Sequence, residues 1–143
     1  MAHAQWHYRT EVVWTGGTQG RLEAAGKPAI TAGAPPEFGG QEGVWTPEDL
    51  VASAVGSCLM TSLLYFVARA NVSLQTCRVA TEAVMAKGPQ GLLITRITVE
   101  CFVTLATAPD EAAVRQALAR AEASCPVSRS LVCPVHVTLH VHS

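Results

Sequence analysis

Two of the five cysteines stand in contexts that could support thiol chemistry. Cys58 lies in the middle of a long apolar stretch, among small residues that leave room around its sulfur. Cys125 precedes Pro126, whose ring disfavours helical geometry at the residue before it, so this thiol is expected at a break between elements. A thiolate can attack a peroxide bond to give a sulfenic acid, which a second thiol converts to a disulfide. A free cysteine is more often a small buried hydrophobe, so Cys58 by itself leaves both interpretations open.

The spacing of the five cysteines matches neither a zinc ribbon nor the disulfide framework of a small secreted domain. In a reducing compartment all five should begin as thiols, and a disulfide that forms later is then catalytic or sensory. Cys77 and Cys101 fall within predicted strands, where we expect them to be packing residues.

The stretch that carries Cys58, residues 46–70, is predicted to be a helix. Thr46 can cap it, Pro47 suits the first helical position, and Glu48 and Asp49 complement the positive end of the helix dipole. The absence of charge from Val51 to Ala68 predicts a buried helix. Serine and threonine interrupt the apolar run, so we expect it to fall short of the roughly 20 apolar residues of a membrane span.

The remaining patterns predict an α+β fold with antiparallel hairpins in a single domain, residues 1–143. The alternation of apolar residues and the Gly/Pro turns predict strands at 6–15, 21–25, 29–31, 77–86, 92–105 and 135–141, with a second helix from Pro109 to Cys125. The element order is therefore β-β-β-α-β-β-α-β, and residues 32–44 form an irregular loop before the long helix.

Composition bears on assembly and partners. Hydrophobic residues make up 49% of the chain and charged residues 15%, compared with roughly 25% charged residues in typical soluble domains. The shortage of charge predicts a homodimer in which a second copy covers apolar surface. The net charge of −1, with scattered Lys and Arg, predicts no nucleic-acid partner. The N-terminus lacks the pattern of a secretory signal, so we expect a cytoplasmic protein.

Two motifs together carry a resemblance to a known family. Thr46-Pro47-Glu48-Asp49-Leu50 followed by Cys58, combined with Cys125-Pro126-Val127-Ser128, resembles the OsmC/Ohr family of osmotically inducible and organic hydroperoxide resistance proteins. Pro35–Gly40 also looks like the loop before the helix in OsmC-like members. The resemblance covers nearly the whole chain. It implies an OsmC-like fold, with antiparallel sheets around a long buried central helix, and an intertwined homodimer.

The resemblance also implies a function. Cys58 would be the peroxidatic cysteine and Cys125 the resolving one, in a thiol-dependent peroxidase of the oxidative stress response. An external dithiol, either a lipoyl-carrying protein or a small dithiol, would reduce the disulfide, and no bound cofactor is expected. The apolar helix around Cys58 favours organic hydroperoxides over hydrogen peroxide as the substrate. The alternative is a redox sensor or apolar-ligand-binding protein without sustained turnover.

The resemblance implies a role for Glu48, and its distance from Cys58 along the helix limits how Glu48 could perform that role. Glu48 and Cys58 are ten positions apart, so on one helix their α-carbons would lie roughly 15 Å apart. If Glu48 orients an activating arginine, as the resemblance implies, it must do so in the partner's pocket. The alternative is that Glu48 only stabilises the start of its own helix through the dipole.

The sequence departs from the family pattern at the positions of the activating arginine. Ohr-like members carry it directly after the Gly-Gly turn, where this chain has Thr18, and OsmC-like members carry it in the loop that here reads Glu37-Phe38. Arg21 and Arg129 are the candidate substitutes, beside the possibility of no arginine. Without a nearby cation, burial would keep the pKa of the Cys58 thiol high and turnover slow.

The final strand carries His136, His140 and His142 at positions of one parity, which puts them on one face. Such histidines can bind a transition metal, with Cys133 as a further ligand. A solvated face of an edge strand is the commoner case, and we expect no metal site.

Overall fold

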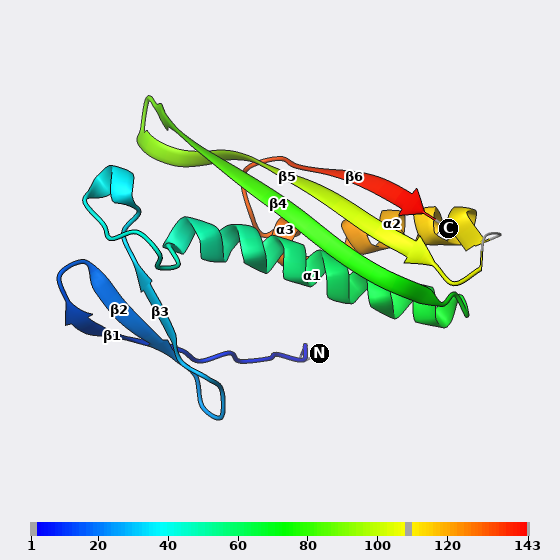
Figure 1. The fold of residues 1–143 in the computed structure, drawn as a ribbon, viewed down its shortest axis with the longest axis horizontal. Coiled ribbons are helices and arrows are strands. Elements are labelled where there is room, and N and C mark those ends of the chain that lie inside the picture. The colour runs from blue at the N-terminus through cyan, green and yellow to red at the C-terminus, as the bar shows by residue number, and fades with distance from the viewer. Residues whose placement is uncertain (1–2, 108–109, 143) are drawn as a thin grey trace. The chain divides into compact units, whose positions relative to one another are not determined.

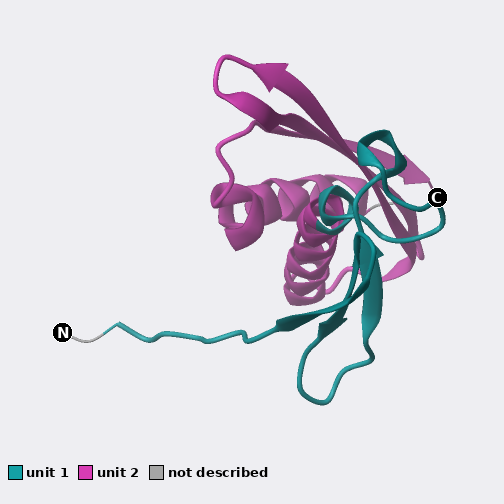
Figure 2. Ribbon diagram, turned by 90° about the vertical axis from the view of Figure 1, so that its left-hand side faces the viewer, with its two compact units in different colours: residues 1–50 teal, residues 51–143 magenta. Residues whose placement is uncertain are grey.

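The computed structural model describes residues 3–107 and 110–142. The chain divides into two compact units, Met1–Leu50 and Val51–Ser143 (Figure 2). The first contains the small N-terminal sheet, and the second contains most of the long helix and a larger sheet. We describe each unit by itself.

The first unit is built on three short antiparallel strands in the order β1-β2-β3, namely β1 (Glu11–Gly16), β2 (Gln19–Glu23) and β3 (Ile30–Gly33). The first strand begins five residues later than the sequence pattern suggested. The predicted loop contains one turn of 3-10 helix, η1 (Pro36–Phe38).

The long helix α1 (Pro47–Arg69) begins and ends close to where the sequence predicted. Thr46 caps it: the Asp49 N–H donates to the Thr46 hydroxyl oxygen at 3.1 Å, and the Thr46 N–H donates to the Asp49 carboxylate at 3.0 Å. This reciprocal pair is a capping box in which Asp49 takes the usual place of glutamate. After the helix, Asn71 adopts the left-handed conformation (φ 57°), which ends the helical path.

The second unit holds a three-stranded sheet in the order β4-β5-β6. Strands β4 (Leu74–Gly88) and β5 (Gly91–Leu105) form an antiparallel hairpin, whereas β6 (Val135–His142) runs parallel to β5. The expectation of purely antiparallel pairing was therefore wrong for this strand. The chain returns to the sheet through α2 (Glu111–Ser124) and α3 (Pro126–Arg129), and such a crossover permits parallel pairing.

The α+β class and the element order are confirmed, with α3 as an added short helix. The predicted start of the second helix at Pro109 lies outside the described residues. The short helix α3 begins at Pro126, directly after Cys125.

The core of the second unit lies between the helices and one face of its sheet (Figure 1). From α1 it takes Val55, Leu59, Leu63 and Val67, from β5 it takes Ile97, Val99, Cys101, Val103 and Leu105, and from α2 it takes Val114, Ala117, Leu118 and Ala121. In the single described chain α1 is buried along one stripe only, because Leu64 and Tyr65 remain 41% and 56% exposed. The predicted all-round burial of α1 is therefore not achieved within one protomer.

By length and composition, α1 is apolar enough to cross a membrane, with a mean hydropathy of 1.9 in its most apolar window. The expectation that its serines and threonines would take it below that level was wrong. The core helix of a soluble protein passes the same test, and the buried stripe of α1 packs within its own unit.

Candidate active site at two thiols

The first thiol of the candidate site lies on α1. Cys58 is half-buried, and the Ser62 hydroxyl, one helical turn further along, donates a hydrogen bond to its sulfur. Because α1 is a continuous helix, the direction of this thiol is fixed by the packing of the buried stripe of α1.

The second thiol lies where α2 ends and α3 begins. Cys125 has an extended backbone (φ −64°, ψ 109°), as expected for a residue before proline, and its side chain is fully buried. This break leaves backbone N–H groups at the start of α3 without helical partners. Those of Val127 and Ser128 donate to the Cys125 sulfur, and the Ser128 hydroxyl lies within hydrogen-bond distance of both this sulfur and the Cys125 carbonyl oxygen (3.3 Å).

The structure brings the two thiols into contact with each other. The Cys58 and Cys125 thiols lie close enough for each to act on the pKa of the other, and the Val127 N–H lies within reach of both sulfurs. The two cysteines are 67 positions apart in the chain, so only the tertiary fold makes this pair. A pair of thiols in contact can close to a disulfide.

The surroundings of the two sulfurs move their pKa values in opposite directions. Burial raises the pKa of Cys58, and the neighbouring Cys125 raises it further, against smaller lowering contributions from Val127 and Ser62. Burial also acts to raise the pKa of Cys125, but hydrogen bonds from Ser128, Cys58 and Val127 together outweigh it, and the pKa is lowered.

A small cavity lies among α1, α2, α3 and β6, and neither cysteine lines it. It has a volume of about 70 Å³ and is lined by Val55, Leu59, Glu122, Ser128, Val135 and Val137. Five of these six residues carry no charge, and burial raises the pKa of the sixth, the carboxyl of Glu122. The cavity is therefore small, and its lining combines four aliphatic side chains with the polar groups of Glu122 and Ser128.

Glu48 lies in the first turn of α1, on the same continuous helix as Cys58, so the separation inferred from the sequence applies. Its Oε2 atom is buried, and within the described residues it has no hydrogen-bond partner. A buried carboxylate oxygen without a donor is costly, and either an ordered water or a donor from another chain would satisfy it.

The two candidate arginines have the following surroundings. Arg21 lies on β2 and forms an exposed ion pair with Glu23 at 3.0 Å. Arg129 lies in the last turn of α3 and is exposed. The largest contributions to the pKa values of Cys58 and Cys125 come from burial, thiols, hydroxyls and backbone amides rather than from a guanidinium group.

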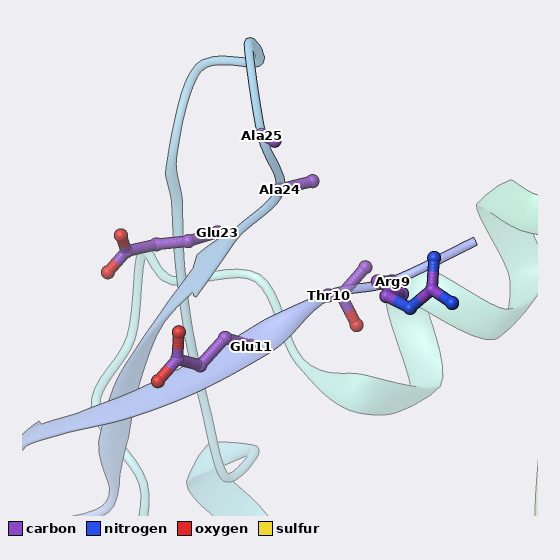
Figure 3. Close-up of a pocket in the computed structure, with 6 residues that line it drawn as sticks. All are labelled: Arg9, Thr10, Glu11, Glu23, Ala24 and Ala25. Carbon is purple, nitrogen blue, oxygen red and sulfur yellow. The ribbon is translucent and has the colours of Figure 1, made fainter. Parts of the chain in front are cut away.

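The first unit has two hollows of its own, and neither is lined by a cysteine. One is an apolar groove of about 670 Å³ whose lining includes Val12, Trp14, Leu22, Pro47 and Leu50. The other, of about 360 Å³, lies along β1 and β2, where the carboxylates of Glu11 and Glu23 lie on the same side of the hairpin (Figure 3). These two glutamates are directly opposite in the strand register.

The three histidines of β6 share the face of the sheet opposite to the core, as the spacing indicated. His140 stacks on Phe102 with ring centroids 4.5 Å apart and contacts Glu100 at 3.2 Å. His136 and His142 pair with threonines of β5 and are exposed. Among the described residues, no group of three or more His, Cys, Asp or Glu side chains could hold a metal ion.

The donors around the thiols were not predicted from the sequence. Ser62 follows Cys58 by four residues and Ser128 follows Cys125 by three, which are the spacings at which side chains meet on one helical face. Those spacings were the available signal for the serines. The Val127 N–H could not have been identified, because its role depends on the break at Cys125.

Comparisons with known proteins agree with this architecture. A profile of the family described as OsmC-like protein matches residues 39–140. A search of curated proteins finds no match.

Several solved structures resemble the chain over nearly their whole length. An OsmC-like protein of unknown function from Vibrio cholerae is 17% identical, with a TM-score of 0.87 over 95% of this chain and 100% of that one. An organic hydroperoxide resistance protein OsmC from Legionella pneumophila is 22% identical, with a TM-score of 0.72 over 99% and 100%. An organic hydroperoxide resistance protein from Elizabethkingia anophelis is 17% identical, with a TM-score of 0.73 over 98% and 99%. At these identities the likeness establishes the fold.

Proposed function

The chain belongs to the OsmC-like protein family, and from this membership and the contact between its two thiols we propose that it is a thiol-dependent peroxidase for organic hydroperoxides. The observation that carries the proposal is the proximity of the Cys58 and Cys125 thiols, which lie 67 positions apart in the chain and act on each other's pKa. Two relatives of the same fold are named as organic hydroperoxide resistance proteins, which supports the same reaction class.

In this proposal Cys58 attacks the hydroperoxide, because it is the partly exposed thiol of the pair. Its sulfur is oxidised to a sulfenic acid while the peroxide is reduced to an alcohol. Cys125 then forms the disulfide with Cys58, and water is released. A dithiol, either a lipoyl protein or a small molecule, reduces the disulfide and completes the cycle.

The apolar residues that surround Cys58 on α1 support a substrate with a hydrocarbon part. Val55, Leu59 and Val135 offer no hydrogen bonds from their side chains, so a hydroperoxide with an alkyl chain fits better than hydrogen peroxide. We also propose that the protein acts in the oxidative stress response, that it is located in the cytoplasm, and that it needs no bound cofactor.

We further propose that the active form is a homodimer. The unpartnered Glu48 oxygen and the exposed apolar residues of α1 both support a second copy against this helix. Glu48 would then orient an activating group in the pocket of the partner, with Arg21 as a candidate for that group. The exposed ion pair of Arg21 with Glu23 leaves its guanidinium able to take another partner.

The test is a peroxidase assay with cumene hydroperoxide and either dihydrolipoamide or dithiothreitol. We expect the wild type to consume the hydroperoxide catalytically, Cys58→Ser to be inactive, and Cys133→Ser, the matched control at a cysteine outside the pair, to retain activity. A wild-type rate no higher than that of Cys58→Ser would contradict the proposal.

A second candidate function is a redox sensor or apolar-ligand-binding protein. It is favoured by the raised pKa of Cys58, which slows peroxide attack, and by the apolar groove of the first unit. In the same assay this candidate predicts one equivalent of hydroperoxide consumed per thiol pair, followed by no further turnover even with dithiol present.

A further inference from the structure

The side of α1 that carries Cys58 continues as a strip of aligned side chains toward the end of the helix. Counted from Cys58, Ser62 is four residues along, Tyr65 and Phe66 are seven and eight, and Arg69 is eleven. These are the spacings at which residues of an α-helix share one side. Between Cys58 and Arg69 the helix has no charged residue, so Arg69 is the first charge along this strip.

A second arginine reaches the same end of the strip from α2, which lies beside the C-terminal half of α1 (Figure 1). The guanidinium carbon of Arg120 lies over the ring of Phe66, 4.7 Å from its centroid, and that of Arg69 lies over the ring of Tyr65 at 5.5 Å. The two rings meet edge to face, with their centroids 5.1 Å apart. Two cations and two aromatic rings therefore form one group, which we call the arginine–aromatic cluster.

Both helices place this cluster on the same side of the thiol pair. Cys125 directly follows α2, and Arg120 lies five residues before it. On α1 the order runs the other way along the chain, from Cys58 to Tyr65 and Phe66. At a rise of roughly 1.5 Å per residue, the α-carbons of these two aromatic residues lie about 10–12 Å along α1 from that of Cys58. The two guanidinium groups are held at the level of the rings.

The strip lies on a different side of α1 from Leu64. Around the axis of a helix with 3.6 residues per turn, Ser62, Tyr65 and Arg69 all lie within about 40° of Cys58. Leu64 lies about 120° away from Cys58 in the same measure. A second copy packed on Leu64 therefore approaches α1 from another side.

The two guanidinium groups of the cluster are available to bind an anion. Among the described residues neither forms an ion pair with a carboxylate, whereas Arg21 and Arg115 do. A guanidinium that stacks on an aromatic ring keeps N–H donors at its edge, and the two oxygens of a carboxylate match that fork of donors. The arginine–aromatic cluster therefore has the chemistry of a binding site for a carboxylate that carries an apolar chain.

We propose that Arg69 and Arg120 bind the carboxylate of the hydroperoxide substrate, and so select hydroperoxides that carry an acid group at the far end of an alkyl chain. The inference rests on the proposed peroxidase function and adds a specificity to it. An extended chain covers roughly 1.1–1.2 Å per bond, since a polypeptide covers roughly 3.3–3.6 Å with three bonds. The separation of about 10–12 Å therefore fits about nine or ten bonds between the carboxyl carbon and the peroxide oxygen that Cys58 attacks.

The test compares three hydroperoxides in the dithiol-coupled assay: the 9-hydroperoxide of linoleic acid, its methyl ester, and cumene hydroperoxide. The measured quantity is the ratio of kcat/KM for the acid to kcat/KM for the ester. We expect Arg69→Gln and Arg120→Gln each to lower this ratio about two- to fivefold, through a higher KM for the acid, because an exposed ion pair with the carboxylate is lost. Added salt should also lower the ratio in the wild type, because it screens exposed charges.

Arg115→Gln is the matched control, because it removes the same charge from α2 outside the cluster, and its ratio should equal that of the wild type. An unchanged ratio in Arg69→Gln and Arg120→Gln would overturn the inference. Equal losses with all three hydroperoxides would overturn it as well, because they would indicate a structural role. In both cases, consumption of cumene hydroperoxide by the wild type would leave the peroxidase proposal standing. If the wild type consumed none of the three hydroperoxides, the peroxidase proposal would fail and this inference with it.

Discussion

At the scale of single residues, Cys101 and Cys125 form an informative contrast. Both side chains are 0% exposed, yet burial raises the pKa of Cys101 to about 12 while the pKa of Cys125 is lowered. Cys101 lies in the middle of β5, where the backbone N–H groups are engaged in the ladders to β4 and β6. Cys125 lies at a helix break, where N–H groups are free to donate to sulfur. The local backbone, rather than burial, decides which thiol can ionise.

The high pKa of Cys101 predicts a loss of stability in alkaline solution. A cysteine in the unfolded chain ionises near its ordinary pKa of 9.0, but the folded one resists ionisation up to about 12, so the unfolded state binds fewer protons in this window. The free energy of unfolding therefore decreases with pH in this window. The contribution of Cys101 is retained below pH 9.0, and above it the free energy of unfolding falls by at most about 1.4 kcal/mol per pH unit. The free energy of unfolding in urea, measured from pH 8 to pH 11 for wild type and Cys101→Val, should fall less steeply with pH in the variant. Parallel curves would contradict this origin.

At the scale of elements, α1 is determined by local signals at its start and by a close approach in its middle. The capping box of Thr46 and Asp49 fixes where it begins. At Gly56 the helix comes so close to β4 that an added Cβ would meet Thr81 Cγ2 at 2.9 Å and Val79 Cγ1 at 3.5 Å. Gly56 lies two residues before Cys58, so this contact also holds the part of the helix that carries Cys58 against the sheet.

Gly56→Ala should therefore destabilise the protein, although alanine favours a helix by about 1 kcal/mol. The clash with Thr81 is expected to cost about 1–3 kcal/mol and to outweigh that gain. Thr81→Ser removes the methyl group in question, so the double variant should recover most of the loss. Urea unfolding of both single variants and the double variant measures the coupling between them. Additive effects of the two substitutions would mean that this contact is not the cause.

Thr46→Ala tests the start of the helix. Loss of the hydroxyl that accepts from the Asp49 N–H should lower the free energy of unfolding by about 1 kcal/mol. Thr61→Ala is the matched control on the same helix, because the Thr61 hydroxyl bonds only to carbonyl groups one turn back and caps nothing. We expect its effect on urea unfolding to be small. Equal losses in the two variants would contradict the capping role.

At the scale of the whole molecule, the described chain leaves an unusual amount of apolar surface uncovered. Exposed large hydrophobic side chains occur on α1, where Leu64 and Tyr65 lie outside the buried stripe, and on the first unit, where Val12, Trp14 and Trp45 are exposed. Trp14 lines the apolar groove of the first unit, whereas Trp45 and Tyr65 are exposed in the single protomer. A chain with only 15% charged residues has little polar surface to offset this.

This surface predicts that the protein is a dimer in solution and that a charge on the exposed side of α1 breaks it. Leu64→Glu should shift the sedimentation coefficient from that of a dimer to that of a monomer, because an unpaired carboxylate in an apolar interface is costly. Gln116→Glu, on the exposed side of α2, introduces the same charge and should leave the dimer intact. A monomeric wild type, or an unchanged dimer in Leu64→Glu, would contradict the prediction.

The sequence alone was sufficient for the features that local sterics and capping control. The bounds of α1, the hairpin of β4 and β5, and the extended backbone of Cys125 follow from Thr46, Pro47, the Gly-Pro turn and Pro126, whose effects act within a few residues. The α+β class follows from the order of such elements.

The tertiary structure decided what depends on residues far apart in the chain. The parallel pairing of β6, the one-sided burial of α1 and the convergence of Ser128 and Val127 on the thiol pair each require long-range packing. The resemblance of two motifs predicted that Cys58 and Cys125 belong together, and the fold brings them close to each other. Only the fold showed which donors surround the two sulfurs, because hydrogen-bond donors that gather around a sulfur from separate elements leave no periodic pattern in the sequence.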